Sequence, residues 1–274
     1  MGVKATGIDL KIASLAEEIN KAQSYIETLT YSGVYRPHVY ALAYSCACLG
    51  HCKAFLLLVR EGHWPSTYPI VRAAVEAMIR VDELSADPIQ AIKEIEYSSV
   101  DERLSWRHAD HRAALGLPDV DNGGVDLKGQ RDAWKALGAK HPKITDRIKL
   151  VDAGVSAEVI TETGDDPDKF FALWKRCSQS AHMGGNQIAH LMCSVSDQGS
   201  ISVTPELPPP DEIVNELASG CHKSLWLTMH RLDNLMFNTR QQSDNGEMIL
   251  CDTSANDYNA LLAQAKAYPA LAST

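Results

Sequence analysis

Residues 174–185, WKRCSQSAHMGG, place a guanidinium, hydroxyls and an imidazole in one short stretch. An imidazole can exchange a proton near neutral pH, and a guanidinium pairs with carboxylates and phosphates. Ser178 and His182 are four residues apart, so they share one face of a helix. Arg176 and His182 are six apart and point about 120° away from each other on a straight helix, so they meet only if the helix ends or bends. The glycine pair that closes the stretch predicts such an ending.

The same residues also suit a helix end that does no chemistry. Lys175, Arg176 and His182 are favourable beside the negative C-terminal end of a helix dipole. The stretch can therefore be interpreted either as a functional site or as a polar helix end.

A second constellation lies on the predicted third helix, in RAAVEAMIR. Arg72 and Glu76 are four residues apart and can pair on one helix face. Most of their neighbours are apolar, so little of this helix faces water, and an unpaired buried charge is costly. The pair either ties helices together or faces a polar pocket, and we prefer the first interpretation.

The predicted fourth helix carries a basic face in ERLSWRHADHR, which holds Arg103 and His108. A solvent-exposed charged face is the favoured interpretation. His108 and His111 could share a metal ion, but no third ligand accompanies them in a known pattern. We therefore predict no metal site.

Apolar residues at steps of three and four predict an all-α protein, a helical bundle with long central helices. Proline and acidic start signals and glycine breaks bound the helices. SVSDQGSISV predicts a small β-hairpin insertion near 191–204. We expect a single domain over 1–274, with a peripheral insertion at 116–165. The predicted helices cover about 9–30, 37–62, 67–85, 88–115, 130–139, 143–153, a segment from Asp166-Pro167 to His182, a long helix from Asp211, and 255–267.

Composition excludes several classes of protein. The 274 residues carry a formal charge of −9, which argues against an extended surface for double-stranded DNA but not against a local nucleotide or single-stranded RNA site. Seven cysteines without a C-x-x-C pair predict reduced thiols in a cytoplasmic protein. The apolar segment 39–59 holds Ser45, His51 and Lys53, which favours a core helix over a membrane span. The sequence contains no P-loop, dinucleotide fingerprint or nucleophile elbow.

The order of these features resembles a bacterial all-α family of unknown function. The likeness spans about 35–235 and rests on WPSTYPIVRAAVEAMIRVDEL and on the S-x-x-x-H element from Ser178 to His182. That family is distantly similar to the HEPN superfamily, helical bundles that often dimerise and include metal-independent ribonucleases with an R-x(4–6)-H motif. Arg176 to His182 matches this motif, as does Arg103 to His108. The residue after the motif arginine, Cys177 or Leu104, departs from the usual polar one.

The resemblance implies a dimeric, metal-independent and cofactor-free endoribonuclease, a toxin or defence effector. His182 would transfer a proton and Arg176 would stabilise the phosphorane, while Arg72 and Glu76 orient them from the facing helix. The alternative is a non-catalytic helical module of a defence or stress system, whose partner is a nucleotide, RNA or another protein. Arg72, Glu76, Ser178 and His182 would line its pocket without turnover, and Arg103 and His108 are further candidate binding residues.

Overall fold

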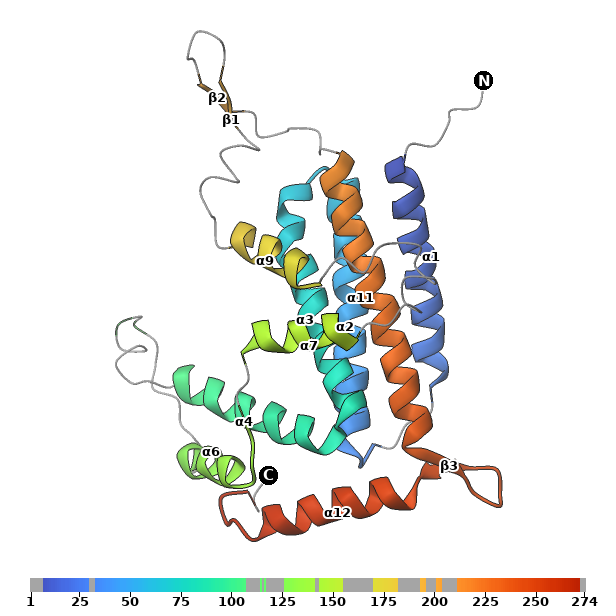
Figure 1. Cartoon of the computed structure of the whole chain (residues 1–274), viewed down its shortest axis with the longest axis vertical. Coiled ribbons are helices and arrows are strands. Elements are labelled where there is room, and N and C mark those ends of the chain that lie inside the picture. Colours follow the sequence, from blue (N-terminus) through green and yellow to red (C-terminus); the bar gives the residue numbers. More distant parts are fainter. Residues whose placement is uncertain are drawn as a thin grey trace. The chain divides into compact units, whose positions relative to one another are not determined.

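The protein is all-α, as the sequence predicts, and carries two small antiparallel hairpins (Figure 1). The computed structural model describes residues 7–29, 33–106, 114, 116, 126–140, 143–154, 170–181, 193–195, 201–203 and 211–271. The helices are α1 (Gly7–Thr28), α2 (Arg36–Arg60), the 3₁₀ turn η1 (Trp64–Ser66), α3 (Thr67–Ala86), α4 (Pro88–Trp106), α6 (Leu127–Ala136), α7 (Ile144–Gly154), α9 (Phe170–Ala181), α11 (Asp211–Asn238) and α12 (Asp252–Lys266). One hairpin pairs β1 (Cys193–Val195) with β2 (Ile201–Val203), which confirms the predicted insertion, and the other pairs β3 (Arg240–Gln242) with β4 (Met248–Leu250).

Residue contacts divide the chain into two compact units. The first contains 1–29, 41–82 and 144–233, and the second contains 30–40, 83–143 and 234–274. Helices α2, α3 and α11 contribute residues to both units. Of the predicted insertion 116–165, α6 belongs to the second unit and α7 to the first, and the prediction of one domain with an insertion stays a prediction.

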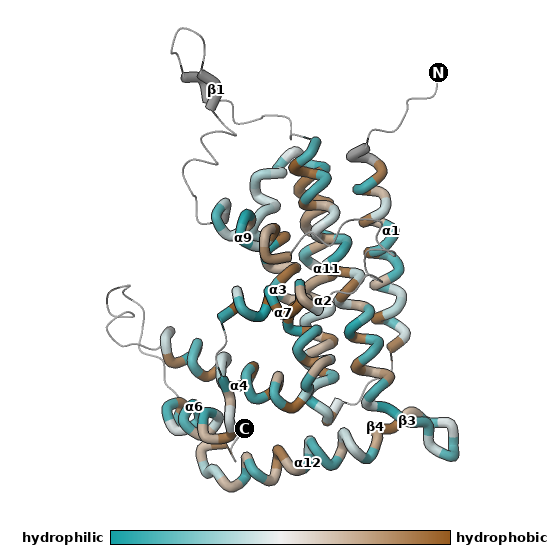
Figure 2. The backbone as a smooth tube through the Cα atoms, viewed as in Figure 1, coloured by the Kyte–Doolittle hydropathy of each residue, from teal (hydrophilic) through white to brown (hydrophobic). Residues whose placement is uncertain are grey.

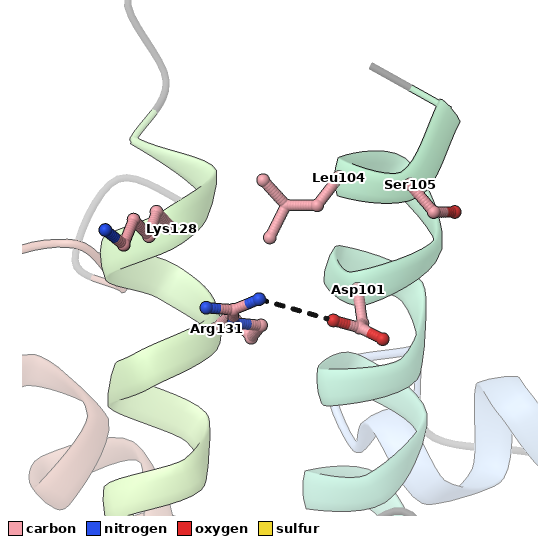
Figure 3. A pocket seen from close by; sticks show the side chains of 5 residues that line it. All are labelled: Asp101, Leu104, Ser105, Lys128 and Arg131. Atoms are coloured by element: carbon pink, nitrogen blue, oxygen red, sulfur yellow. Dashed lines mark ion pairs between the residues drawn. The ribbon is translucent and has the colours of Figure 1, made fainter. Parts of the chain in front are cut away.

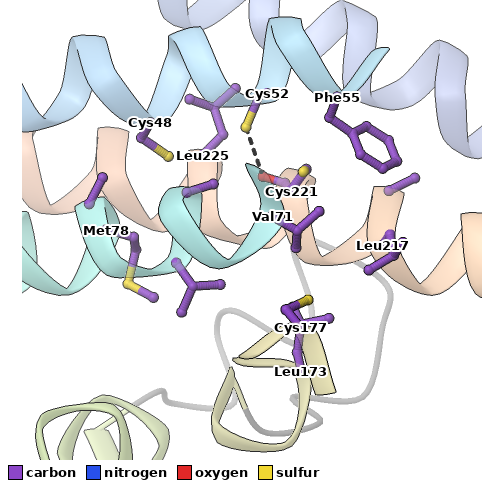
Figure 4. Close-up of a cluster of buried hydrophobic side chains, with 14 of the residues drawn as sticks. Cys48, Cys52, Phe55, Val71, Met78, Leu173, Cys177, Leu217, Cys221 and Leu225 are labelled. Atoms are coloured by element: carbon purple, nitrogen blue, oxygen red, sulfur yellow. Dashed lines mark hydrogen bonds between the residues drawn. The ribbon is translucent and has the colours of Figure 1, made fainter. Parts of the chain in front are cut away.

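The core of the first unit is built from the apolar faces of α1, α2, α3, α7, α9 and α11. Hydrophobic and hydrophilic residues alternate along α1 and α11, as expected for helices with one buried side (Figure 2). Buried thiols lie among the aliphatic side chains (Figure 4), and Cys52 Sγ donates to the carbonyl of Cys221 at 3.5 Å. The six cysteines whose side chains the structure describes are all free.

Helix α2 supplies part of this core and is also the most apolar helix. Among the described helices it alone is long and apolar enough to cross a membrane, and a third of the tested window is buried. Core helices of globular proteins pass the same test. Cys48, Cys52 and Phe55 of α2 are fully buried in the first unit, which is what the sequence predicts for a core helix.

Local hydrogen bonds lie at the starts of two helices. The backbone N–H of Gln90 donates to Asp87 Oδ1 at 3.0 Å, so Asp87 caps α4 and Pro88 takes its first position. Thr67, at the start of α3, donates its hydroxyl to the Trp64 carbonyl at 2.5 Å.

In the second unit, α6 packs against α4 and buries one face. Its buried residues recur at helical spacing: Leu127, Gln130, Ala133 and Trp134.

A separate buried group joins the start of α2 to the end of α11, where a ring nitrogen of His38 lies 2.6 Å from Thr239 Oγ1. Burial, with a smaller contribution from Arg240, lowers the pKa of His38 from 6.5 to about 4.

The sequence analysis does not predict the β3–β4 hairpin. Its turn is made by Asn245-Gly246, a dipeptide typical of hairpins, and Gly246 has a φ of 81°. The Ser243 N–H donates to the Glu247 carbonyl at 2.8 Å and closes the turn. β3 (RQQ) is polar and β4 (MIL) is apolar, and each has three residues, too few to show the alternation that marks a longer strand.

Candidate functional site

The predicted pair on α3 meets α9. Glu76 Oε1 accepts from Arg72 Nε at 2.8 Å and from Trp174 Nε1 at 2.9 Å. The Arg72 guanidinium lies over the indole, with Cζ 5.3 Å from the ring centroid. Because Glu76 and Trp174 are 98 residues apart, these contacts fasten one helix to another. We call Arg72, Glu76 and Trp174 the clamp.

The clamp is partly buried, and its members bond to one another. The Arg72 and Glu76 side chains are 27% and 37% exposed, and Trp174 is 9% exposed. The two hydrogen bonds satisfy the partly buried carboxylate of Glu76 within the fold. The arrangement favours the structural interpretation of the Arg72–Glu76 pair.

Other contacts also hold α9 in place. At its start, the Phe171 N–H donates to Asp152 Oδ2 of α7 at 3.1 Å. Against α11, a Cβ at Gly220 would clash with Leu173, so this glycine lets the two helices approach closely. Further along, Arg176 forms an ion pair with Glu216 of α11. Its guanidinium is therefore already bound to a carboxylate.

Cys177 of the same helix is fully buried in the core, and Figure 4 shows it beside Leu173. Burial raises the pKa of its thiol to about 12, Glu216 adds to the rise, and Arg176 and Arg72 oppose it. The thiolate is the reactive form of cysteine, so this group is a poor nucleophile.

The remaining predicted residues divide into described and undescribed ones. Ser178 is half-buried and follows Trp174 by four residues, so it lies on the face of α9 that carries the clamp. Arg103 lies on the exposed surface of α4, in the second unit. His182, His108 and His111 lie outside the described residues, and a meeting of His182 with Arg72 stays a prediction.

Sequence reasoning missed two partners in this region. Trp174 lies in the quoted stretch, one turn before Ser178 on the same face, and this spacing was the available signal. Glu216 on α11 carried no signal, because nothing local links it to Arg176.

A second candidate site is a hollow of about 390 Å³ between α4 and α6, lined by Asp101, Leu104, Ser105, Lys128 and Arg131. In Figure 3 the side chains of Arg131 and Asp101 reach toward each other across the gap, with Leu104 between the helices. Lys128 and Ser105 lie at the rim, with their polar atoms turned outward in this view. Sequence analysis did not predict this site.

The start of α6 sets where the two cations lie. Asp126 is the N-cap and accepts from the Gly129 N–H at 2.8 Å, and a Cβ at Gly129 would clash with the capping carboxylate. Lys128 and Arg131 then follow in the first turns, three residues apart and on neighbouring positions of one face. Positive charge is unfavourable near the positive end of a helix dipole. The sequence thus places Lys128, in the first turn, where the helix itself does not stabilise a cation.

Lys128 and Arg131, the two cations at the hollow, are only weakly engaged by carboxylates of the described residues. Arg131 lies 3.7 Å from Asp101 and 3.4 Å from Asp132, beyond the 2.7–2.9 Å typical of strong charge-assisted hydrogen bonds. Lys128 forms no ion pair with any residue that the structure describes. Three other arginine pairs are tight, at 2.7 Å for Arg36–Glu96, 2.8 Å for Arg72–Glu76 and 2.6 Å for Arg231–Asp82. Arg131 therefore keeps hydrogen-bonding capacity for another anion.

Neither a metal site nor similarity to a known protein indicates a function. Within the described part of the chain, no three His, Cys, Asp or Glu side chains gather closely enough to hold a metal ion. No model of a known protein family matches the chain, and no curated protein and no solved structure matches it. The likeness to the HEPN superfamily stays a prediction.

Proposed function

We propose that this protein is a non-catalytic helical binding module that takes a small anionic ligand in the α4–α6 hollow. The observation that carries the proposal is the pair of weakly engaged cations, Lys128 and Arg131, at one cavity. A volume of about 390 Å³ lies within the range of small-molecule sites, roughly 300–1,000 Å³.

The chemistry follows from the two side chains. A guanidinium offers a planar fork of N–H donors to a phosphate or carboxylate, and Lys128 adds a mobile point charge. Its flexible side chain can turn inward once an anion lies on Arg131. A bound anion would also offset the unfavourable dipole at the start of α6.

The test is calorimetric titration of the full chain with inorganic phosphate, against chloride at the same ionic strength. Lys128→Gln and Arg131→Gln should each weaken binding about tenfold, because each removes one charge-assisted contact. Lys135→Gln is the matched control, since Lys135 is exposed on the same helix and does not line the hollow. Wild-type protein that binds no phosphate at millimolar concentration, or an Arg131→Gln variant that binds normally, would refute the proposal.

A second candidate function is a HEPN-like, metal-independent endoribonuclease, a toxin or defence effector in the cytoplasm that acts as a dimer. The clamp supports it, because α3 fastens α9 and thereby fixes the helix that leads to His182. His182 would transfer the proton and Arg176 would stabilise the phosphorane after releasing part of its contact with Glu216.

Incubation of the purified protein with RNA in the presence of a chelator tests this candidate. Cleavage should occur with wild type, disappear in His182→Ala, and persist in Lys175→Ala, whose side chain is exposed beside the motif. RNA that stays intact with wild type, or cleavage unchanged in His182→Ala, would remove it. Light scattering would check the dimer.

A further inference from the structure

We infer that the ligand of the hollow is a phosphate monoester that carries hydroxyl groups, such as a sugar phosphate, and that Asp101 selects it through a hydroxyl. This inference rests on the proposed binding function and adds the ligand class and the residue that selects it. It comes from the charge, size and polarity of the lining.

The charge of the lining favours a ligand with net negative charge. Lys128 and Arg131 contribute two positive charges and Asp101 one negative charge, which leaves +1 among the five lining residues. A zwitterion such as a free amino acid would leave that charge unbalanced. A phosphate monoester, with a charge of about −2 at neutral pH, matches the two cations and suits the arginine fork.

The size of the hollow calls for more than the phosphate group. A cavity of about 390 Å³ has room for an organic body beside the anion. Leu104 of α4 offers an apolar surface between the helices for that body (Figure 3).

The two walls differ in hydrogen-bonding character. The α6 wall presents donors, Lys128 and Arg131, while the α4 wall presents the carboxylate of Asp101, which is an acceptor when ionised. Asp101 is 42% exposed on its side chain and its contact with Arg131 is long, at 3.7 Å. Once phosphate engages Arg131, Asp101 can accept a hydrogen bond from a hydroxyl on the carbon skeleton. Inorganic phosphate carries no hydroxyl on a carbon skeleton, so it cannot make this second contact while its oxygens lie on Arg131.

The experiment compares three probes by calorimetry on the full chain at constant ionic strength: ribose 5-phosphate, inorganic phosphate and ribose. Ribose 5-phosphate should bind about tenfold more tightly than inorganic phosphate, the worth of one charge-assisted hydrogen bond. Ribose alone should not bind. In Asp101→Ala the advantage of the sugar phosphate should vanish, while inorganic phosphate binds at least as well as in wild type.

Asp132→Ala is the matched control for charge. Asp132 also contacts Arg131, at 3.4 Å, but does not line the hollow. Its removal changes the charge equally and should leave the sugar phosphate advantage intact. Equal affinity for the two phosphates in wild type, or an advantage that survives Asp101→Ala, would overturn the inference while leaving phosphate binding in place. Failure of both phosphates to bind would overturn the inference together with the proposed function.

Discussion

The clamp and the hollow each centre on an arginine between two helices, yet the two arginines are held very differently. Arg72 donates to Glu76 at 2.8 Å and lies over an indole that donates to the same carboxylate. Arg131 has two carboxylates within reach, the nearer at 3.4 Å, and borders a cavity beside a second cation. The short distance at Arg72 marks a charge that holds two helices together. The longer distances at Arg131 mark a charge that can still bind a ligand.

This difference warns against inferring function from residue type. The charged pair on the buried helix drew attention in the sequence, and in the structure its members satisfy each other. The hollow uses two ordinary surface cations on a short helix. The comparison predicts that changes in the clamp alter stability, while changes in the hollow alter binding.

The largest effect should follow the loss of the clamp's aromatic member. Trp174→Ala removes a large buried side chain and should lower the free energy of unfolding by about 3–5 kcal/mol. Trp174→Phe keeps most of the ring but leaves Glu76 without the indole donor, so it should cost about 1–3 kcal/mol. Urea denaturation measures both. A loss below about 1 kcal/mol in Trp174→Ala would mean that α9 is not fastened by this contact.

Acid should destabilise the unit that contains the hollow through His38. The pKa of this fully buried side chain is about 4 in the folded protein, against 6.5 for an unperturbed histidine. The unfolded chain therefore binds a proton that the folded chain excludes, and stability present above pH 6.5 is lost as pH falls towards 4, by about 3 kcal/mol at most. Urea denaturation at both ends of this range should show a smaller loss in His38→Gln. An equal loss in the variant would exclude His38 as the cause.

Thiol labelling gives a local measure of the clamp. Cys46 is exposed and should react with a maleimide quickly in the folded protein, whereas buried Cys177 should be protected. Trp174→Ala should accelerate labelling of Cys177 without changing that of Cys46. Peptide mass mapping follows both sites. A rate at Cys177 as fast as at Cys46 in wild type would contradict its burial.

Local features of the fold were predictable and long-range partners were not. Asp87-Pro88 marks the start of α4 because a cap acts within three residues, and apolar periodicity locates the long helices because each buries its own stripe. Glu76 accepts a hydrogen bond from Trp174, which is 98 residues away in the chain. Asp101 lies near Arg131 because α4 packs against α6. Neither is encoded in local spacing. The β3–β4 hairpin lies between these cases, since Asn245-Gly246 signals a turn but its strands are too short to show a pattern.

The most direct test of the central claim is thermal melting of Arg72→Gln and Arg131→Gln, each with and without inorganic phosphate. Arg72→Gln should melt about 2–4 °C below wild type, for a loss of about 1 kcal/mol, and keep the rise in melting temperature that phosphate produces by mass action. Arg131→Gln should melt like wild type without phosphate and lose that rise. A rise retained in Arg131→Gln, or a melting temperature lowered in Arg131→Gln but not in Arg72→Gln, would contradict the assignment of stability to the clamp and binding to the hollow.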